Sequence, residues 1–244
     1  MEKFKNSSFL HALAPVPVWY RKLTSEDVGQ DIDQFNAKIK RIAHIYFQEW
    51  QVEVPDEKHL CKSQMAKSSV TQFQEKQTFS QVNSPSIGKW HAVKTNDLLD
   101  VMEPETQLLR EIILKDYKQA VNDYYNSFDQ INLNVLKCAN HHMDESWIQF
   151  YKNGDYKVLH NHLKYGFDPT FMNIWAGGYY IEDGKPDKMQ PYAGKFSFRV
   201  RDHNHYVHPE PGLLMMWPGD ILHEVHPFYG EQERVVINFN LSMR

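Results

Sequence analysis

His160 and His162 occupy alternate positions at the end of the segment Gly154–His162, whose residues are typical of a β-strand. Side chains two residues apart on a strand point to the same face of a sheet, so the two imidazoles could bind a single metal ion. An isolated pair of this kind is more often solvent-exposed or hydrogen-bonded than bound to metal. The pair therefore indicates a metal site only if a further ligand joins it.

A third histidine, His223, stands near the C-terminus in the segment Trp217–Pro227. In a β-barrel, strands that are distant in sequence can lie side by side, so a strand at His223 could return to the strand that carries His160 and His162. Three histidines on one side of a metal ion would leave its other coordination positions open to a substrate. We therefore predict that these three residues are the metal ligands.

Arg234 follows His223 by eleven residues and begins an alternating strand. On that strand, Val236, Asn238 and Asn240 would share the inward face with Arg234. A cation inside a small barrel is costly unless it meets an anion, and the carboxylate of a bound cosubstrate would satisfy the guanidinium group. The alternative is an arginine on a solvated strand face. We favour the cosubstrate role for Arg234, and we count Asn240 among the candidate cosubstrate-binding residues.

The elements that must position these side chains change in kind along the chain. Two amphipathic helices are predicted, one from Thr24 or Ser25 to about Trp50 and one from Pro104 to about Tyr125. After residue 131, short runs typical of strands alternate with turns that contain glycine. The predicted strands cover residues 146–151, 156–160, 174–181, 194–200, 213–217 and 234–241.

Helices followed by many short strands indicate an α+β fold, in which closed or sandwiched antiparallel β-structure carries the helices along one sheet. We expect one domain over residues 1–244, with helical support and loops in 1–130 and the β core in 131–244. Residues 9–20 are expected to form an opening strand or an extended segment, confined to an edge by Pro15 and Pro17. Residues 63–88 are expected to form a long polar loop.

Composition argues against several functions. The formal charge of −4 and the pI near 6.3 do not indicate binding to nucleic acid or to an acidic membrane surface. No apolar run approaches the ~20 residues that a membrane-spanning helix needs, and residues 1–14 do not read as a signal peptide. Cys61 and Cys138 lack the spacing of a zinc site, so we interpret them as reduced structural thiols of a cytoplasmic protein.

The C-terminal motifs, together with others upstream, resemble a known family. They are similar to those of the 2-oxoglutarate/Fe(II) oxygenases of marine phages and bacteria, which are relatives of the prolyl 4-hydroxylases. The matching residues are Trp147, Gly154-Asp155-Tyr156, the His-x-His pair, Gly178-Tyr179-Tyr180, Pro211 to His223, Val225-His226-Pro227, Gly230, Arg234 and Phe239-Asn240. Weaker similarity is found in Ala14–Trp19 and Gly88–His91, so only residues 147–240 carry specific motifs.

The resemblance implies a double-stranded β-helix, a jelly-roll or cupin-like fold, with Fe(II) at its open mouth. It implies 2-oxoglutarate as cosubstrate, with its distal carboxylate on Arg234, and O₂ as the oxidant. Tyr180 and Tyr151 are further candidates for contact with that carboxylate. The implied reaction is hydroxylation of a peptidyl or amino-acid substrate, as in prolyl hydroxylases, and the partner is a small-molecule or peptidyl substrate. As the composition also indicates, we expect no nucleic-acid or membrane partner and a location in the cytoplasm (the host cytoplasm if a phage encodes the chain).

The chain departs from the family in one residue of the first metal motif. The usual motif is His-x-Asp, whereas this chain has His162 at the third position. Three neutral imidazoles leave the site one negative charge short of the common triad of two histidines and a carboxylate. Either His162 is a ligand, which we favour, or a carboxylate such as Asp168 or Asp155 takes its place.

Two other functions remain open. A three-histidine cupin dioxygenase would bind its substrate directly to iron without 2-oxoglutarate, and a non-catalytic β-barrel would bind metal or a ligand without turnover. Three more histidines, His203, His205 and His208, could suggest a second metal, but their segment is typical of a polar hairpin or loop with a solvated face.

Overall fold

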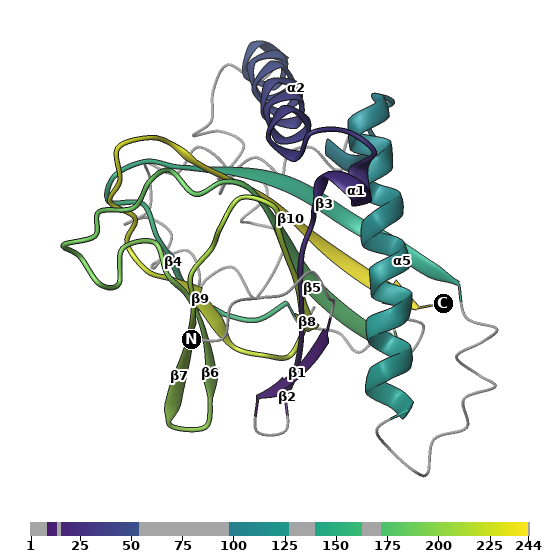
Figure 1. The fold of residues 1–244 in the computed structure, drawn as a ribbon. Coiled ribbons are helices and arrows are strands. Elements are labelled where there is room, and N and C mark those ends of the chain that lie inside the picture. The colour runs from purple at the N-terminus through teal and green to yellow at the C-terminus, as the bar shows by residue number, and fades with distance from the viewer. Residues whose placement is uncertain (1–8, 14–15, 54–97, 127–139, 163–171, 244) are drawn as a thin grey trace.

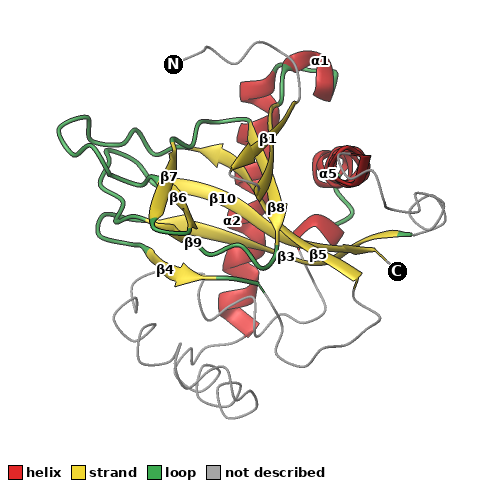
Figure 2. Cartoon of the chain, turned by 90° about the horizontal axis from the view of Figure 1, so that it is seen from below, coloured by secondary structure: helices red, strands yellow, loops and turns green. Residues whose placement is uncertain are grey.

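The structure, a computed structural model, describes residues 9–13, 16–53, 98–126, 140–162 and 172–243. Two antiparallel sheets face each other, and two long helices lie beside the larger sheet, away from the smaller one (Figure 1, Figure 2). Neither long helix has the apolar length that a bilayer span requires, and no other helix of the described residues has it.

The larger sheet has six strands and the smaller sheet has four. The larger sheet has the order β1-β2-β8-β5-β10-β3, and its strands are β1 Phe9–Leu13, β2 Val16–Lys22, β8 Leu213–Pro218, β5 Met172–Glu182, β10 Arg234–Met243 and β3 His141–Tyr151. The smaller sheet has the order β4-β9-β6-β7, and its strands are β4 Lys157–His160, β9 His223–Val225, β6 Phe196–Val200 and β7 His203–Val207.

The connections from β3 to β10 alternate between the two sheets. From β3 in the larger sheet the chain passes to β4 in the smaller sheet and back to β5 in the larger one. It then forms the β6–β7 hairpin in the smaller sheet, returns to β8 in the larger sheet, passes to β9 in the smaller sheet and ends in β10 of the larger sheet. First and last strands pair as β3 with β10, and β4 with β9. This double winding confirms the predicted double-stranded β-helix, and it explains how His160 and His223 become neighbours although a long stretch of chain separates them.

The helices cover the outer face of the larger sheet. They are α1 Ser25–Val28, α2 Ile32–Glu53, the short 3₁₀ helix η2 Leu98–Asp100, and α5 Pro104–Asn126. Apolar residues of α2 and α5, among them Phe35, Ile39, Ile113 and Tyr117, form one buried cluster with the outward side chains of the sheet. The predicted packing of helices on one sheet is therefore confirmed.

A second buried cluster fills the space between the sheets. It contains aromatic and aliphatic side chains that alternate in sequence with those of the outer cluster, including Tyr151, Tyr180, Phe196, Trp217 and Val236. Because strand side chains alternate between faces, β5, β8 and β10 contribute to both clusters at once. Arg234 shares a face of β10 with Val236 of the inner cluster, so it points into the same space between the sheets.

Three local features differ from the sequence expectation. The predicted first helix is two helices, because Gly29 ends α1 with φ +64° and Asp31 accepts a hydrogen bond from the Gln34 N–H at the start of α2. The predicted first strand is the β1–β2 hairpin. Pro17 is in β2, which is not an edge strand, but β2 pairs with β8 only from Trp19 onward, so the missing N–H of Pro17 breaks no bond there.

Candidate metal and cosubstrate site

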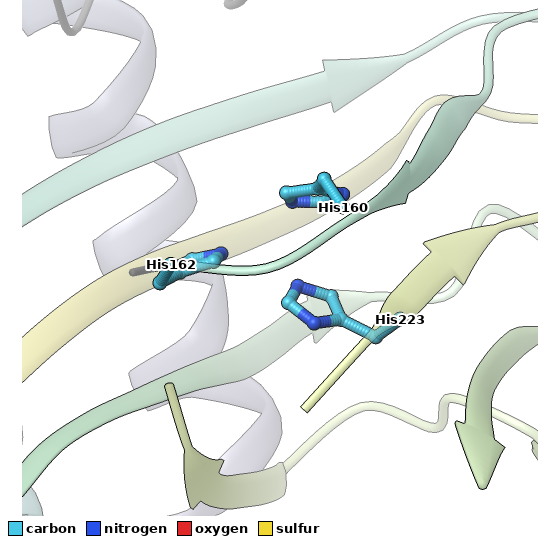
Figure 3. A group of neighbouring side chains, drawn as sticks. All are labelled: His160, His162 and His223. Atoms are coloured by element: carbon cyan, nitrogen blue, oxygen red, sulfur yellow. The ribbon is translucent and has the colours of Figure 1, made fainter. Parts of the chain in front are cut away.

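Three histidines meet at one end of the β4–β9 strand pair. His160 ends β4, His162 follows it by two residues, and His223 begins β9, with the three rings turned toward one another (Figure 3). Ring centroids lie 4.3 Å apart for His160 and His223 and 4.9 Å apart for His162 and His223. One potential ligand atom from each residue lies within 4.8 Å of the other two. A single metal ion can therefore contact all three rings.

Each of the three rings has its Nδ1 atom engaged with a carbonyl oxygen. The acceptors are Val158 O at 2.7 Å from His160, Ile221 O at 2.8 Å from His223, and the side-chain Oδ1 of Asn240 at 2.5 Å from His162. A carbonyl oxygen can only accept, so Nδ1 carries the hydrogen in each ring. Each Nε2 then carries a lone pair that can bind a metal, as in many metal-binding histidines.

Burial keeps two of these rings neutral. The pKa of His160 and the pKa of His223 both lie well below the usual value, mainly because burial disfavours the charged imidazolium and because neighbouring histidines and Lys157 add like charge. At neutral pH, no proton has to be displaced from His160 or His223 before a metal binds. The site is therefore prepared to act as a ligand set for a divalent cation.

No carboxylate joins the three histidines among the described residues. The Asp155 side chain accepts a hydrogen bond from Lys152 N at 2.8 Å and so closes the turn before β4. Asp168, the other alternative ligand, lies outside the described residues. The grouping supports His162 as the third ligand, which remains a prediction.

Arg234 lies buried at the start of β10, with 1% of its surface exposed, and faces the space between the sheets. Its guanidinium carbon lies 5.1 Å from the ring centroid of Tyr151 and 5.0 Å from that of Tyr180. Its Nη1 donates a hydrogen bond to Gly194 O. Its Nε and Nη2 are also buried, and neither has a hydrogen-bond partner in the described residues. Two such unpartnered donors fit the two oxygens of a carboxylate.

The backbone at Gly194 shapes this pocket. Gly194 has φ +61°, and a side chain there would begin 2.8 Å from the Phe228 ring and 3.1 Å from Arg234 Nη1. Both the backbone conformation and the lack of space require glycine. Burial raises the pKa of Tyr151 and of Tyr180, against the opposing effect of Arg234, so both hydroxyl groups remain protonated. The Tyr151 hydroxyl donates to Gln149 Oε1 at 2.7 Å, which leaves the Tyr180 hydroxyl as the one that could donate to an anion.

The predicted inward face of β10 is confirmed. Val236 belongs to the inner cluster, and Asn238 Nδ2 donates to Gln149 Oε1 at 2.8 Å. Asn240 lies close to the metal site rather than to Arg234, because its amide contacts His162. The cosubstrate role of Asn240 stays a prediction. Its contact with His162, a predicted metal ligand, was not expected from the sequence.

Lys157 is an interior cation that the sequence did not indicate. It lies opposite Val225 in the β4–β9 ladder, as His160 lies opposite His223, so all four residues share the inner face. Regular alternation would put Lys157 and His160 on opposite faces, but a register shift between them restores the same face. No side chain or carbonyl group of the described residues forms a hydrogen bond or an ion pair with the Lys157 ammonium group. Burial lowers its pKa to about 8.

The remaining histidines lie apart from this group. His203 and His205 are on β7, which forms the predicted hairpin with β6, and His208 follows that strand. His226 contacts Ser197 through its Nε2 at 3.2 Å. None of them belongs to a cluster of potential metal ligands in the residues that the structure describes. A second metal site is therefore not supported there.

The double-stranded β-helix, the three-histidine group and the buried arginine define a jelly-roll protein with a candidate metal site and a candidate carboxylate-binding residue. Residues 145–240 match the model of the family described as "Putative 2OG-Fe(II) oxygenase". The resemblance drawn from the sequence is thus confirmed for residues 145–240, which match the model of this oxygenase family. The family's cofactors are Fe(II), 2-oxoglutarate and O₂.

Solved structures with similarity to the chain include three hydroxylases or oxygenases. A viral collagen prolyl hydroxylase from Paramecium bursaria Chlorella virus-1 has 15% identity and a TM-score of 0.41, covering 58% of this chain and 75% of the other. A Pseudomonas putida prolyl-4-hydroxylase has 20% identity and a TM-score of 0.36, covering 59% and 69%. A 2OG-Fe(II) oxygenase family oxidoreductase from Burkholderia pseudomallei has 13% identity and a TM-score of 0.40.

The match to the Burkholderia pseudomallei oxidoreductase covers 58% of this chain and 58% of that chain. No curated protein sequence matches this chain.

Proposed function

We propose that the protein is a 2-oxoglutarate- and Fe(II)-dependent dioxygenase that hydroxylates a peptidyl or amino-acid substrate. The observation that carries this proposal is the pair of buried, unpartnered donors on Arg234, which lie in the same interior as the three histidines. A buried guanidinium group without an anion is costly, so the pocket is built for one. 2-Oxoglutarate has one carboxylate for Arg234 and a second that can reach a metal ion.

The chain's own residues divide the work between binding and orientation. His160, His162 and His223 would hold the iron through Nε2, each ring being kept in place by its Nδ1 contact. Bound Fe(II) would supply the activation of O₂ that couples decarboxylation of 2-oxoglutarate to hydroxylation of the substrate. Arg234 would bind the distal carboxylate, and Tyr151 and Tyr180 flank the guanidinium group from two strands.

The charge of the interior also favours a dianionic cosubstrate. The three imidazoles are taken as neutral ligands, so a divalent metal, Arg234 and protonated Lys157 make the site strongly positive. No carboxylate of the described residues joins the metal group. The two carboxylates of 2-oxoglutarate would offset much of this charge, and its entry would raise the pKa of Lys157 again.

A partly exposed aromatic side chain supports a substrate position beside the metal. The Trp147 ring is half-buried, and its centroid lies 5.9 Å from that of His162. An indole ring at this position could pack against an aliphatic or proline ring of a peptide. This placement supports a peptidyl or amino-acid substrate. So do Tyr151 and Tyr180 beside Arg234, whose suggested role rests on the resemblance to prolyl hydroxylases.

A three-histidine dioxygenase that does not use 2-oxoglutarate is the second candidate. The observation that favours it is the absence of a carboxylate from the metal group in the described residues. In that reaction the substrate itself would bind the iron, and Arg234 would bind an acidic group of the substrate.

The test is anaerobic loading of the protein with Fe(II), followed by 2-oxoglutarate and O₂, with detection of succinate. Succinate formation that depends on iron supports the proposal, and stimulation by proline-containing peptides supports the substrate class. Iron binding with O₂ uptake but no succinate would favour the three-histidine dioxygenase. Iron binding without O₂ uptake and without succinate would indicate a non-catalytic metal-binding barrel.

A further inference from the structure

We propose that Glu145, acting through Asn240, fixes the tautomer of His162 and supplies the negative charge that a carboxylate ligand would otherwise bring to the metal site. This inference rests on the proposed function, because it takes His162 as a metal ligand. The three residues form a chain of hydrogen bonds. The His162 Nδ1 atom lies 2.5 Å from Asn240 Oδ1, and Asn240 Nδ2 lies 3.1 Å from Glu145 Oε2.

The positions of these residues follow from strand pairing. Glu145 lies directly opposite Asn240 in the β3–β10 ladder, so both side chains point to the inner face. Asn240 in turn reaches His162, which lies 78 residues earlier in the chain. Asn240 thus contacts both early parts of the β core. It pairs with Glu145 of β3 in the ladder, and its side chain contacts His162, which follows β4 by two residues.

The direction of each hydrogen bond is determined by Glu145. An ionised carboxylate can only accept, so the amide NH₂ of Asn240 must face Glu145 and its oxygen must face His162. An amide oxygen also only accepts, so His162 must donate from Nδ1. The hydrogen on Nδ1 leaves Nε2 with its lone pair, directed to the metal. The Glu145 carboxylate, which is two hydrogen bonds away from the His162 ring, therefore determines which ring nitrogen can bind the metal.

The same series of hydrogen bonds brings a negative charge close to the three-histidine site, which lacks a carboxylate ligand among the described residues. Carboxylates that accept from metal-binding histidines raise the basicity of the ring and fix its orientation. Here the carboxylate acts through an amide, whose polarisation carries part of that effect. Asn240 is 5% exposed, so water competes little for its two bonds. Glu145 and Asn240 are positioning residues in this account, since neither is required to touch the metal.

The experiment compares metal affinity and imidazole tautomer in four proteins. Nitrogen-15 NMR of the metal-free protein reports whether His162 carries its hydrogen on Nδ1 or Nε2, and titration with Co(II), followed by its absorption bands, reports affinity. In Glu145→Gln the new amide can donate as well as accept, so Asn240 can flip. We expect mixed tautomers of His162 and a loss of Co(II) affinity of about 3- to 10-fold, toward the low side of effects seen for such outer residues.

A second variant keeps the proposal falsifiable if the first merely disturbs packing. The double variant Glu145→Gln with Asn240→Asp places the carboxylate directly on His162 Nδ1, and the glutamine amide can donate to it. This double variant should restore the Nδ1–H tautomer and bring Co(II) affinity back to at least the wild-type value. A purely structural role predicts no such rescue.

The matched control is Asp144→Asn. Asp144 is the neighbour of Glu145 on β3 and accepts from Ser242 Oγ at 2.9 Å, so its replacement removes the same charge without touching the chain to His162. If Glu145→Gln gives the same tautomer and the same affinity as Asp144→Asn, the inference is overturned. Failure of the wild-type protein to bind Co(II) would overturn the proposed function and, with it, the metal-binding part of this inference. A shift of tautomer in the metal-free variant does not depend on cosubstrate or turnover.

Discussion

His160 and His223 lie directly opposite each other in the β4–β9 ladder, with ring centroids 4.3 Å apart. This pairing joins β9, the second-to-last strand of the chain, to β4, the second strand of the β core. A cross-strand pair is a rigid way to hold two ligands, because the hydrogen-bonded ladder sets their separation. The predicted metal site therefore depends on the pairing of β4 with β9 as much as on the residue types.

Replacement of either ladder histidine should abolish metal binding. In His160→Ala or His223→Ala, only two rings remain, and a buried site with two neutral ligands holds Fe(II) weakly. Calorimetric titration with Fe(II) under anaerobic conditions, or with Co(II) in air, measures the loss. His203→Ala, which changes an exposed histidine on β7, should bind metal like the wild type. Full metal affinity in His223→Ala would show that the ligand assignment is wrong.

His162→Asp should still bind iron, and the added negative charge should tighten the binding. The aspartate recreates the His-x-Asp motif of the family, although it is shorter and cannot donate to Asn240. His162→Ala should lose metal affinity and succinate formation together. If His162→Ala retains both, His162 does not bind the metal, and Asp168→Ala should then be tested in the same assays.

Arg234→Ala should raise the concentration of 2-oxoglutarate that gives half-maximal turnover by about tenfold or more. That factor corresponds to roughly 1.5–3 kcal/mol for the lost charge-assisted hydrogen bonds. Metal affinity should change little, because Arg234 does not belong to the histidine group. Arg199→Ala is the matched control, since Arg199 is an exposed arginine of β6. An unchanged 2-oxoglutarate dependence in Arg234→Ala would favour the three-histidine dioxygenase.

Lys157→Met should stabilise the metal-free protein at neutral pH. Burial lowers the pKa of Lys157 to about 8 from the usual 10.5, so between these values the unfolded chain binds a proton that the folded chain does not. Stability of the wild type should therefore rise as pH increases from about 8 to 10.5, by at most about 3 kcal/mol. Urea unfolding across this range measures the slope.

The slope assigned to Lys157 should disappear in Lys157→Met and persist in Lys188→Met, which changes an exposed lysine. Bound 2-oxoglutarate should reduce the wild-type slope, because an anion near the ammonium group raises its pKa. Equal slopes in all three proteins would mean that Lys157 is solvated rather than buried in the interior.

The sequence predicted most of the β core because its strands have clear local patterns. Six of the strands from residue 141 onward were predicted from alternation and from the turns between them. Strand β7, with the polar sequence His-Asn-His-Tyr-Val, was interpreted as a hairpin or loop, and β9 has only three residues, too few for a pattern. Both are strands because partners in β6 supply their hydrogen bonds, which is a property of the sheet and not of the segment.

The sequence by itself determined which side chains could share a face, since strand alternation is a local property with a period of two residues. That was enough to place His160 with His162, and Arg234 with Asn238 and Asn240. Only the tertiary structure decided which of these faces meet and at what register. The shift in β4 turned Lys157 inward, and the closure of the two sheets brought Asn240 to His162 across 78 residues. Such contacts depend on pairing between distant strands, and no local pattern encodes the pairing partner.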